Sequence, residues 1–218
     1  IAIAQDSSER SISAVVRAQR IETAVAVCHQ QLFLKKPRID AFLIGCGTVG
    51  RELIQQIKKQ QAWLQKQNIE LNLVGLANSK QCLLDGDGIA LEQWQADLAA
   101  ATEPLSLERL KSFVRSEHLT NPLIIDCTSN QGIAMQYLNY LQAGFHVVTA
   151  NKKANTDSLS YYQQLHAMAA KKQRRFLYET NVGAGLPVID NLQNLLRAGD
   201  ELLQFEGILS GSLSYIFG

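Results

Sequence analysis

The chain has 218 residues, of which 46% are hydrophobic and 19% are charged, and this apolar content excludes a disordered polymer. Lys and Arg number 21 against 20 Asp and Glu, so the formal net charge is +1. That balance provides no overall positive charge that would indicate nucleic-acid binding, and no apolar run reaches the roughly 18 residues that cross a bilayer. We therefore expect neither a nucleic-acid partner nor a membrane partner.

The four cysteines, Cys28, Cys46, Cys82 and Cys127, lie far apart, with no CxxC pair and no Cys/His cluster at zinc spacing. This usage predicts free, buried thiols in a reducing compartment and a cytoplasmic location. The first residue is Ile1 and not Met, so the chain is either processed or a fragment of a longer protein, and we expect a fragment. No signal peptide is visible.

Residues 1–37 differ in pattern from the rest and predict two strands followed by an amphipathic helix. The strands are expected near Ile1–Ala4 and Ser11–Val16, and the helix over Glu22–Leu34. These few elements cannot bury a core alone, so we interpret them as the end of a small α+β domain. Lys35-Lys-Pro-Arg38 is a charged break with a proline, which is typical of a linker.

From residue 38 onward, short apolar strands alternate with helical patterns. Strands are predicted at Ile39–Ile44, Leu71–Ala77, Leu123–Cys127, Phe145–Thr149, Phe176–Glu179 and Leu202–Leu209. Helices are predicted at Val49–Gln67, Leu91–Leu98, Ser106–His118, Gln131–Ala143, Thr156–Lys172 and Pro187–Ala198, and residues 79–103 are otherwise expected to be loop. This order predicts an α/β protein with a Rossmann-like, doubly wound parallel sheet.

The sharpest motif is Gly45-Cys-Gly47-Thr-Val-Gly50, which follows a predicted strand and opens a predicted helix. The first glycine permits a tight turn, the second lets backbone N–H groups approach a pyrophosphate, and the third lets the helix pack on the strand. The helix N-terminus adds free donors and a positive dipole. The motif therefore predicts a dinucleotide site, and a glycine turn without a ligand is the alternative.

The end of the second strand in such a fold commonly carries an acid that binds the ribose 2′-hydroxyl. Here that position holds Asn78-Ser79-Lys80, and Glu70 lies before the strand instead of after it. A hydroxyl and a cation suit a 2′-phosphate, so the sequence favours NADP, with NAD use also possible. Lys80 is equally compatible with an ordinary solvated lysine.

Polar residues also follow the next two strands. Asp126-Cys-Thr-Ser129 follows one of them and Asn151-Lys-Lys153 follows the other. Ligands of open α/β sheets bind at these carboxyl ends, although Thr128 and Ser129 could equally cap the next helix. A lysine here could meet a carbonyl or a carboxylate, and a surface charge is the commoner outcome.

The segment Glu179-Thr-Asn-Val-Gly-Ala-Gly-Leu-Pro187 forces irregular backbone after a strand. One carboxylate with exposed carbonyls would suit a hard cation, but spacing alone favours a tight turn with Pro187 near a helix start. The last residues, Gly207–Tyr215, contain three serines that could bind a polar substrate. No GxSxG elbow or paired catalytic carboxylates indicate a hydrolase.

Several segments in this order resemble homoserine dehydrogenases: GCGTVG, VGLANSK, DCTS, FHVVTANKKA, YETNVGAGLP and GILSGSLSYIFG. The resemblance covers residues 38–218 and is greatest to the threonine-regulated type fused to an aspartokinase. It implies NAD(P)H-dependent, reversible reduction of aspartate semialdehyde to homoserine in amino-acid biosynthesis. It also implies three parts: residues 1–37 as the remnant of a regulatory ACT domain with its linker, 38–178 as the NAD(P)-binding domain, and 179–218 as the start of a substrate-binding and dimerisation domain.

The resemblance assigns roles to individual residues. Those implied to bind the dinucleotide are Gly45, Gly47, Thr48, Val49, Gly50, Asn78, Ser79, Lys80, Thr128, Ser129 and Lys152. Lys152 is also implied to contact the substrate and serve catalysis, and Ser212 is implied to lie near the substrate. Glu179, with the carbonyls of Val182, Ala184 and Leu186, matches a cation site of the sodium type.

The family places its principal catalytic lysine and aspartate in a later segment of the form DPxxDxxGxDxxxK, which does not occur here. The principal acid and base are therefore expected beyond Gly218, the last residue of the chain. We expect this fragment to have little turnover, because a developing alkoxide needs a positioned acid.

Two other functions stay open from the sequence. A non-catalytic dinucleotide-binding regulatory module is the alternative, and a semialdehyde dehydrogenase using the Cys127 thiol is a weaker one. For assembly, a strand at Leu202–Leu209 with one unpaired edge would favour self-association, and we expect a homo-oligomer.

Overall fold

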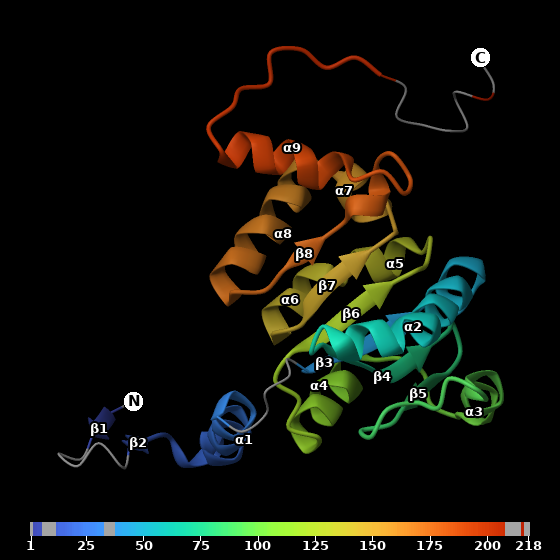
Figure 1. Cartoon of the computed structure of the whole chain (residues 1–218). Helices are drawn as coiled ribbons and strands as arrows, with labels where there is room; N and C mark the ends of the chain where they lie inside the picture. The colour runs from blue at the N-terminus through green and yellow to red at the C-terminus, as the bar shows by residue number, and fades with distance from the viewer. Residues whose placement is uncertain (1, 6–11, 33–37, 208–214, 216–218) are drawn as a thin grey trace.

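The computed structural model describes residues 2–5, 12–32, 38–207 and 215 of the chain. Its centre is a six-stranded sheet in the order β5-β4-β3-β6-β7-β8 (Figure 1). The strands are β3 (Arg38–Ile44), β4 (Glu70–Ala77), β5 (Cys82–Leu84), β6 (Pro122–Asp126), β7 (His146–Thr149) and β8 (Phe176–Leu177). All neighbours pair in parallel except β5, which runs antiparallel to β4. The predicted doubly wound α/β fold is confirmed.

Helices cover both faces of this sheet (Figure 1). The helices are α2 (Thr48–Lys66), α3 (Trp94–Ala100), α4 (Leu107–Ser116), α5 (Gln131–Ala134), α6 (Tyr137–Ala143), α7 (Lys153–Asp157), α8 (Leu159–Lys172) and α9 (Val188–Arg197), with the short turn η2 (Glu179–Asn181) before α9. Phe42 and Ile44 of β3 pack in the core that includes residues of α4, α6 and α8. Ala41 and Leu43 pack in the core of α2 and α3, because successive strand residues face opposite sides.

The antiparallel strand β5 lies where the sequence predicts loop, within residues 79–103. A side-chain turn explains it: Asn78 Oδ1 accepts hydrogen bonds from the N–H groups of Lys80 and Gln81, both at 2.8 Å. This Asx turn reverses the chain within a few residues, so Cys82–Leu84 can pair with the end of β4.

Two predicted helices are each divided in the structure. The predicted Gln131–Ala143 is split into α5 and α6, and Thr156–Lys172 is replaced by α7 and α8. Ser158 causes the second break, because its backbone is extended and its hydroxyl accepts a hydrogen bond from the Tyr161 N–H at 3.1 Å. In the first, Gln136 N donates to the Ile133 carbonyl at 2.9 Å, a tight turn that interrupts the α-helical ladder.

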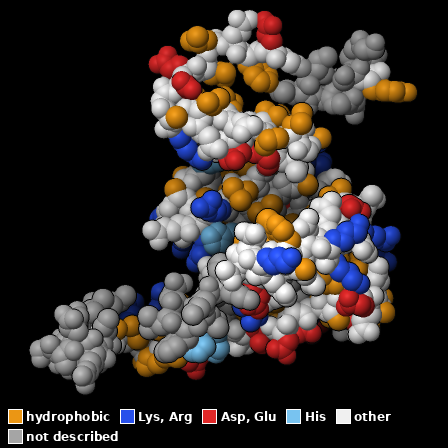
Figure 2. Space-filling view, viewed as in Figure 1, with side chains coloured by type: hydrophobic (Ala, Val, Ile, Leu, Met, Phe, Trp, Pro, Cys, Tyr) orange, Lys and Arg blue, Asp and Glu red, His pale blue; other side chains and the backbone are white. Residues whose placement is uncertain are grey.

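The predicted strand Leu202–Leu209 is wrong over residues 202–207, which have no regular secondary structure, and 208–209 lie outside the described residues. A strand needs a partner for its N–H and C=O groups, and no described segment pairs with this one. The segment therefore gives no support to self-association through a strand edge. Exposed apolar side chains nevertheless gather on α9 and the residues after it, including Leu195, Leu203 and Phe205 (Figure 2).

At the N-terminal end, β1 (Ala2–Gln5) pairs antiparallel with β2 (Ile12–Val15), and η1 (Ala18–Arg20) leads into α1 (Ile21–Leu32). The predicted order of two strands and a helix is confirmed. Arg38, expected to end the linker, is the first residue of β3, whereas residues 35–37 lie outside the described part. Among the described residues, no helix is both long and apolar enough to cross a membrane.

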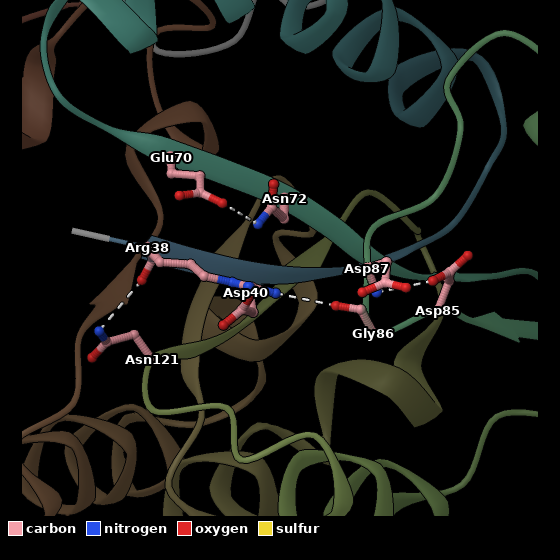
Figure 3. A network of polar contacts seen from close by, with 8 residues as sticks. All are labelled: Arg38, Asp40, Glu70, Asn72, Asp85, Gly86, Asp87 and Asn121. Carbon is pink, nitrogen blue, oxygen red and sulfur yellow. Dashed lines mark hydrogen bonds and ion pairs between the residues drawn. The ribbon is translucent and has the colours of Figure 1, made fainter. Parts of the chain in front are cut away.

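The amino ends of the strands carry a polar network (Figure 3). Arg38 Nε lies 2.7 Å from Asp40 Oδ1, and a terminal guanidinium nitrogen of Arg38 donates to the Gly86 carbonyl at 3.1 Å. Burial raises the pKa of Asp40 although Arg38 acts in the opposite direction. Glu70 lies here as the first residue of β4, paired with Asn72, so it is far along the strand from the end where a ribose-binding acid would be needed.

Candidate functional site

The glycine loop lies at the carboxyl end of β3. Strand β4 lies on one side of β3 in the sheet and strand β6 lies on the other. Gly45 has a φ of +97°, a left-handed conformation that side chains rarely adopt, and a Cβ on it would lie 2.6 Å from Thr128 Cγ2. A Cβ on Gly50 would overlap the Gly45 carbonyl oxygen. Packing therefore requires the first and third glycines, as the motif predicts.

Gly47 is different, because a Cβ on it would meet nothing within 4 Å. It is the N-cap residue of α2 and offers no side chain to cap that helix. The first-turn residues Thr48 and Val49 are exposed beside it. The first N–H groups of a helix lack intrahelical acceptors, so this opening presents several donors and the positive end of a helix dipole to an anion.

A pocket of about 440 Å³ adjoins the loop. Its lining comprises Gly45, Cys46, Gly47, Arg51, Asn78, Ser79, Gln81, Trp94, Gln95, Leu98 and Ala99. Two predicted groups, the glycine loop and Asn78-Ser79, are thus brought together from the ends of β3 and β4. Lys80 is exposed next to them but does not line the pocket.

The polar side chains at this pocket differ in how many hydrogen bonds they already make within the protein. Asn78 is committed to the Asx turn and also donates to Gln81 Oε1 at 3.2 Å, while Gln81 donates to the Ala99 carbonyl at 2.7 Å. Ser79 is exposed. The polar side chains of this pocket with the fewest hydrogen bonds inside the protein are therefore Ser79, Gln95 and Arg51, of which Arg51 uses only its Nε.

Arg51 is a pocket residue that sequence reasoning missed. It lies one turn into α2, its backbone N–H donates to the Gly47 carbonyl at 2.9 Å, and its Nε donates to the Cys46 carbonyl at 3.3 Å. Its place in the sequence could have indicated a position at the pocket. A residue four places beyond Gly47 lies on the same face of the helix start as Gly47.

A second polar cluster lies at the ends of β6 and β7. Asp126 is fully buried, and its carboxylate accepts hydrogen bonds from Tyr137 OH at 2.5 Å and from the Thr128 N–H at 2.7 Å. Burial raises the pKa of Tyr137, and the Asp126 carboxylate adds to that rise, so the phenol keeps its proton as the donor. Thr149 Oγ1 lies 2.6 Å from the same phenol oxygen.

Asn151 joins this cluster to the surrounding loops. Its side-chain amide nitrogen lies 3.1 Å from Asp126 Oδ2, 3.3 Å from Thr128 Oγ1 and 3.0 Å from the Asn130 carbonyl. Lys152 lies exposed immediately after it. The structure therefore places the loop of Thr128 and the loop of Lys152 at one edge of the sheet.

The predicted residues Thr128 and Ser129 follow β6 but do not cap the next helix. Asn130 takes that role, because its Oδ1 accepts a hydrogen bond from the Ile133 N–H at 3.1 Å. The Thr128 hydroxyl instead accepts from the Asn130 N–H at 3.1 Å. The sequence leaves two roles open for Thr128 and Ser129, ligand binding and helix capping. Because Asn130 caps the helix, the capping role is wrong for these two residues.

Glu179 acts in this structure as a remote cap of α9. Its two carboxylate oxygens accept hydrogen bonds from the N–H groups of Ile189 and Asp190, each at 2.9 Å. The Leu186 carbonyl accepts from the Val188 N–H at 2.9 Å, and Ala184 has a φ of 53°. Among the described residues, no group of three His, Cys, Asp or Glu side chains could hold a metal ion.

The end of the chain carries two predictions that the structure does not reach. Ser212, expected near the substrate, lies outside the described residues. Gly218 lies outside them as well, so the expectation that the principal acid and base follow Gly218 stays a prediction.

The thiols do not form a nucleophilic site. Each of the four cysteine positions is described and holds a free thiol, but only Cys82 is buried, whereas Cys46 and Cys127 are half-buried and Cys28 is exposed, contrary to the expectation of burial. Burial raises the pKa of both Cys46 and Cys127 to about 11, and the Asp126 carboxylate beside Cys127 acts in the same direction. A thiol in this state is mostly protonated at neutral pH, which speaks against a Cys127 nucleophile.

Alkylation should therefore distinguish the thiols. With iodoacetamide at pH 7.5, we expect Cys28 to be modified first and Cys127 far more slowly, because a pKa of about 11 leaves roughly one thiolate in a few thousand thiols. Peptide mass spectrometry over time measures both rates, and raising the pH toward ~9.5 should accelerate labelling of Cys127. Equal labelling of Cys127 and Cys28 at neutral pH would restore the thiol hypothesis.

The comparisons with known proteins agree on one family. The family model described as the NAD binding domain of homoserine dehydrogenase matches residues 45–179. A bifunctional aspartokinase/homoserine dehydrogenase from Haemophilus influenzae is 56% identical over the whole chain, and one from Buchnera aphidicola is 48% identical. The chain covers 27% of the length of each of these relatives, so it spans about a quarter of the curated proteins that it matches.

Solved structures agree on the fold. A Candida auris protein of unknown function is 33% identical, with a TM-score of 0.73 over 83% of this chain and 49% of that chain. A hyperthermophilic archaeal homoserine dehydrogenase in complex with NADPH gives a TM-score of 0.59 over 74% of this chain and 50% of that chain. Its identity of 23% means that this second likeness shows the fold alone.

Proposed function

This chain belongs to the family of the homoserine dehydrogenase NAD-binding domain, and from that premise we propose that it holds the cofactor of a homoserine dehydrogenase. The observation that carries the proposal is the open helix start at Gly47, flanked by two glycines that packing requires and by the 440 Å³ pocket. The glycine loop and the first turn of α2, with Thr48 and Val49, would bind the pyrophosphate. The pocket between α2, the end of β4 and α3 would take the adenosine.

We propose NADP as the main cofactor, with NAD also accepted. Ser79 and Arg51 line the adenosine pocket, and Lys80 is the exposed neighbour of Ser79. Glu70, the acid at the spacing of a ribose-binding carboxylate, lies at the opposite end of β4 and cannot reject a 2′-phosphate there. A guanidinium suits phosphate because its planar donors can make two parallel hydrogen bonds.

The reduced nicotinamide would supply the hydride that converts aspartate semialdehyde to homoserine. Thr128 and Ser129 are proposed to line the nicotinamide side, and Lys152 is proposed to meet the carbonyl oxygen of the substrate from the neighbouring loop. An exposed lysine there stabilises negative charge as it develops on that oxygen. The acid that completes proton transfer is proposed to lie beyond Gly218, so little turnover is expected from residues 1–218 alone.

We further propose a sodium-type cation at Glu179 and the carbonyls of Val182, Ala184 and Leu186. All of the proposed ligand atoms are oxygens, which suits a hard cation. The Glu179 carboxylate already caps α9. Each carboxylate oxygen has a second acceptor position, so capping and cation binding are chemically compatible. Ser212 is proposed to contact the substrate.

Membership of this family also suggests how the longer protein is organised. Residues 1–37 would end an aspartokinase regulatory ACT domain, 38–178 form the cofactor domain, and 179–218 begin a substrate-binding and dimerisation domain. The exposed apolar side chains on α9 suit burial in such a domain and a homo-oligomer (Figure 2). Free thiols are consistent with a cytoplasmic protein.

Substitution of the middle glycine tests the proposed function. Gly47→Ala should change the free energy of unfolding by less than about 1 kcal/mol, because its Cβ has open space. The same methyl group would stand where the pyrophosphate approaches, so we expect NADPH affinity to fall at least about tenfold. Titration by nicotinamide fluorescence and urea unfolding measure the two effects.

Gly50→Ala is the matched control, because its Cβ overlaps the Gly45 carbonyl and should destabilise the fold by roughly 2–3 kcal/mol. Unchanged NADPH affinity in a folded Gly47→Ala variant would contradict the proposed pyrophosphate site.

Cofactor preference tests the phosphate subsite. Arg51→Ala and Lys80→Ala should each weaken NADPH binding about tenfold, as expected for a lost charge-assisted contact, and leave NADH affinity nearly unchanged. Lys111→Ala is the control, since Lys111 is a lysine of α4 paired with Glu108. Equal losses of NADPH and NADH affinity in the Arg51 and Lys80 variants would instead indicate contacts to a part that both cofactors share.

A further inference from the structure

Asn151 is a buried amide that contacts both loops expected around the nicotinamide. It is 2% exposed, and its amide nitrogen reaches Thr128 Oγ1 at 3.3 Å and the Asn130 carbonyl at 3.0 Å, which fixes the loop after β6. Its own Oδ1 accepts a hydrogen bond from the Lys153 N–H at 3.1 Å, which fixes the loop after β7. Lys152 therefore lies in the chain between Asn151 and Lys153, whose N–H donates to Asn151.

Asn151 is itself held by buried groups. Asp126 Oδ2 accepts from its amide nitrogen at 3.1 Å, and Thr149 Oγ1 accepts from its backbone N–H at 2.9 Å. The Tyr137 phenol contacts both of these partners, donating to Asp126 and lying 2.6 Å from Thr149 Oγ1. Both polar atoms of the Asn151 amide are thus committed, which favours one orientation of the side chain.

We propose that Asn151 is a positioning residue that sets the distance between the Thr128–Ser129 loop and Lys152, and thereby shapes the nicotinamide half of the cofactor site. The inference rests on the proposed function, because it presupposes a dinucleotide at the glycine loop. Asn151 is too buried to touch the cofactor itself. It acts through Thr128 and Lys152.

This role predicts an effect confined to one half of the dinucleotide. The adenosine pocket is built by the glycine loop, the end of β4 and α3. The hydrogen bonds of the Asn151 amide go instead to Asp126 and to the loops after β6 and β7. Loss of the amide should therefore loosen the nicotinamide side and leave the adenosine side as it was.

The test compares two ligands on the chain of residues 1–218: NADPH, and 2′-phospho-ADP-ribose, which lacks the nicotinamide. Asn151→Ala should weaken NADPH about tenfold, as for a lost buried hydrogen-bond partner, and change 2′-phospho-ADP-ribose affinity less than about twofold. Calorimetric titration measures both ligands. Asn139→Ala removes an exposed amide of α6 as the matched control and should change neither affinity.

A second pair keeps the test decisive if Asn151→Ala does not fold. Thr149→Val removes the hydroxyl that holds the Asn151 backbone, and Thr149→Ser keeps it, so only Val should lower NADPH affinity selectively. Equal weakening of both ligands would show that the network only supports the fold, which overturns the inference. Failure of the unmodified chain to bind either ligand would overturn the proposed function and the inference together.

Discussion

The close approach of β3 and β6 at their carboxyl ends is the constraint on which the site depends. The Cys127 N–H donates to the Ile44 carbonyl at 2.8 Å, which extends the parallel pairing past the end of β6. At that spacing Gly45 faces Thr128, and any side chain on residue 45 would collide with it. The chain must therefore leave β3 through a left-handed glycine, and this turn directs the start of α2 across the edge of the sheet.

The two edges of the sheet have opposite chemistry. At the amino edge, Arg38 pairs with Asp40 and donates to the Gly86 carbonyl, and the carboxylates of Glu70, Asp85 and Asp87 lie in the same network (Figure 3). At the carboxyl edge, the uncapped start of α2 at Gly47 has free donors, and Arg51 reaches the adjacent pocket. The carboxylates at the first edge repel an anion, whereas the helix start at the second edge attracts one. This contrast is the physical basis for placing the cofactor there.

Much of the fold was predictable because strand and helix periods are clear in the sequence. The strands that end at Ile44, Ala77 and Asp126 are predicted within one residue of their ends, and Ser106 caps α4 as expected, accepting from the Arg109 N–H. The failures have local or long-range causes. The break before α8 depends on the Ser158 hydroxyl, and residues 202–207 have apolar strand character without a described partner strand.

The site was predictable where a motif imposes geometry and not where geometry arises between distant segments. The roles of Gly45 and Gly50 follow from the spacing of the loop. The sequence assigns no role to the Arg51 or Asn151 side chain, because the pocket beside Arg51 and the contact of Asn151 with Asp126 arise only in the fold. Glu179 is predicted as a cation ligand, and its capping of α9 could not be inferred from spacing.

Hydrogen–deuterium exchange with and without NADPH tests the proposed cofactor site most directly, because it maps the bound region without assuming which residues bind. We expect slower exchange in residues 45–51, at the end of β4 and in the loops after β6 and β7, with no change at the amino edge around Arg38 and Asp40. Protection confined to the amino edge, or none at saturating NADPH, would contradict a cofactor site at the carboxyl edge.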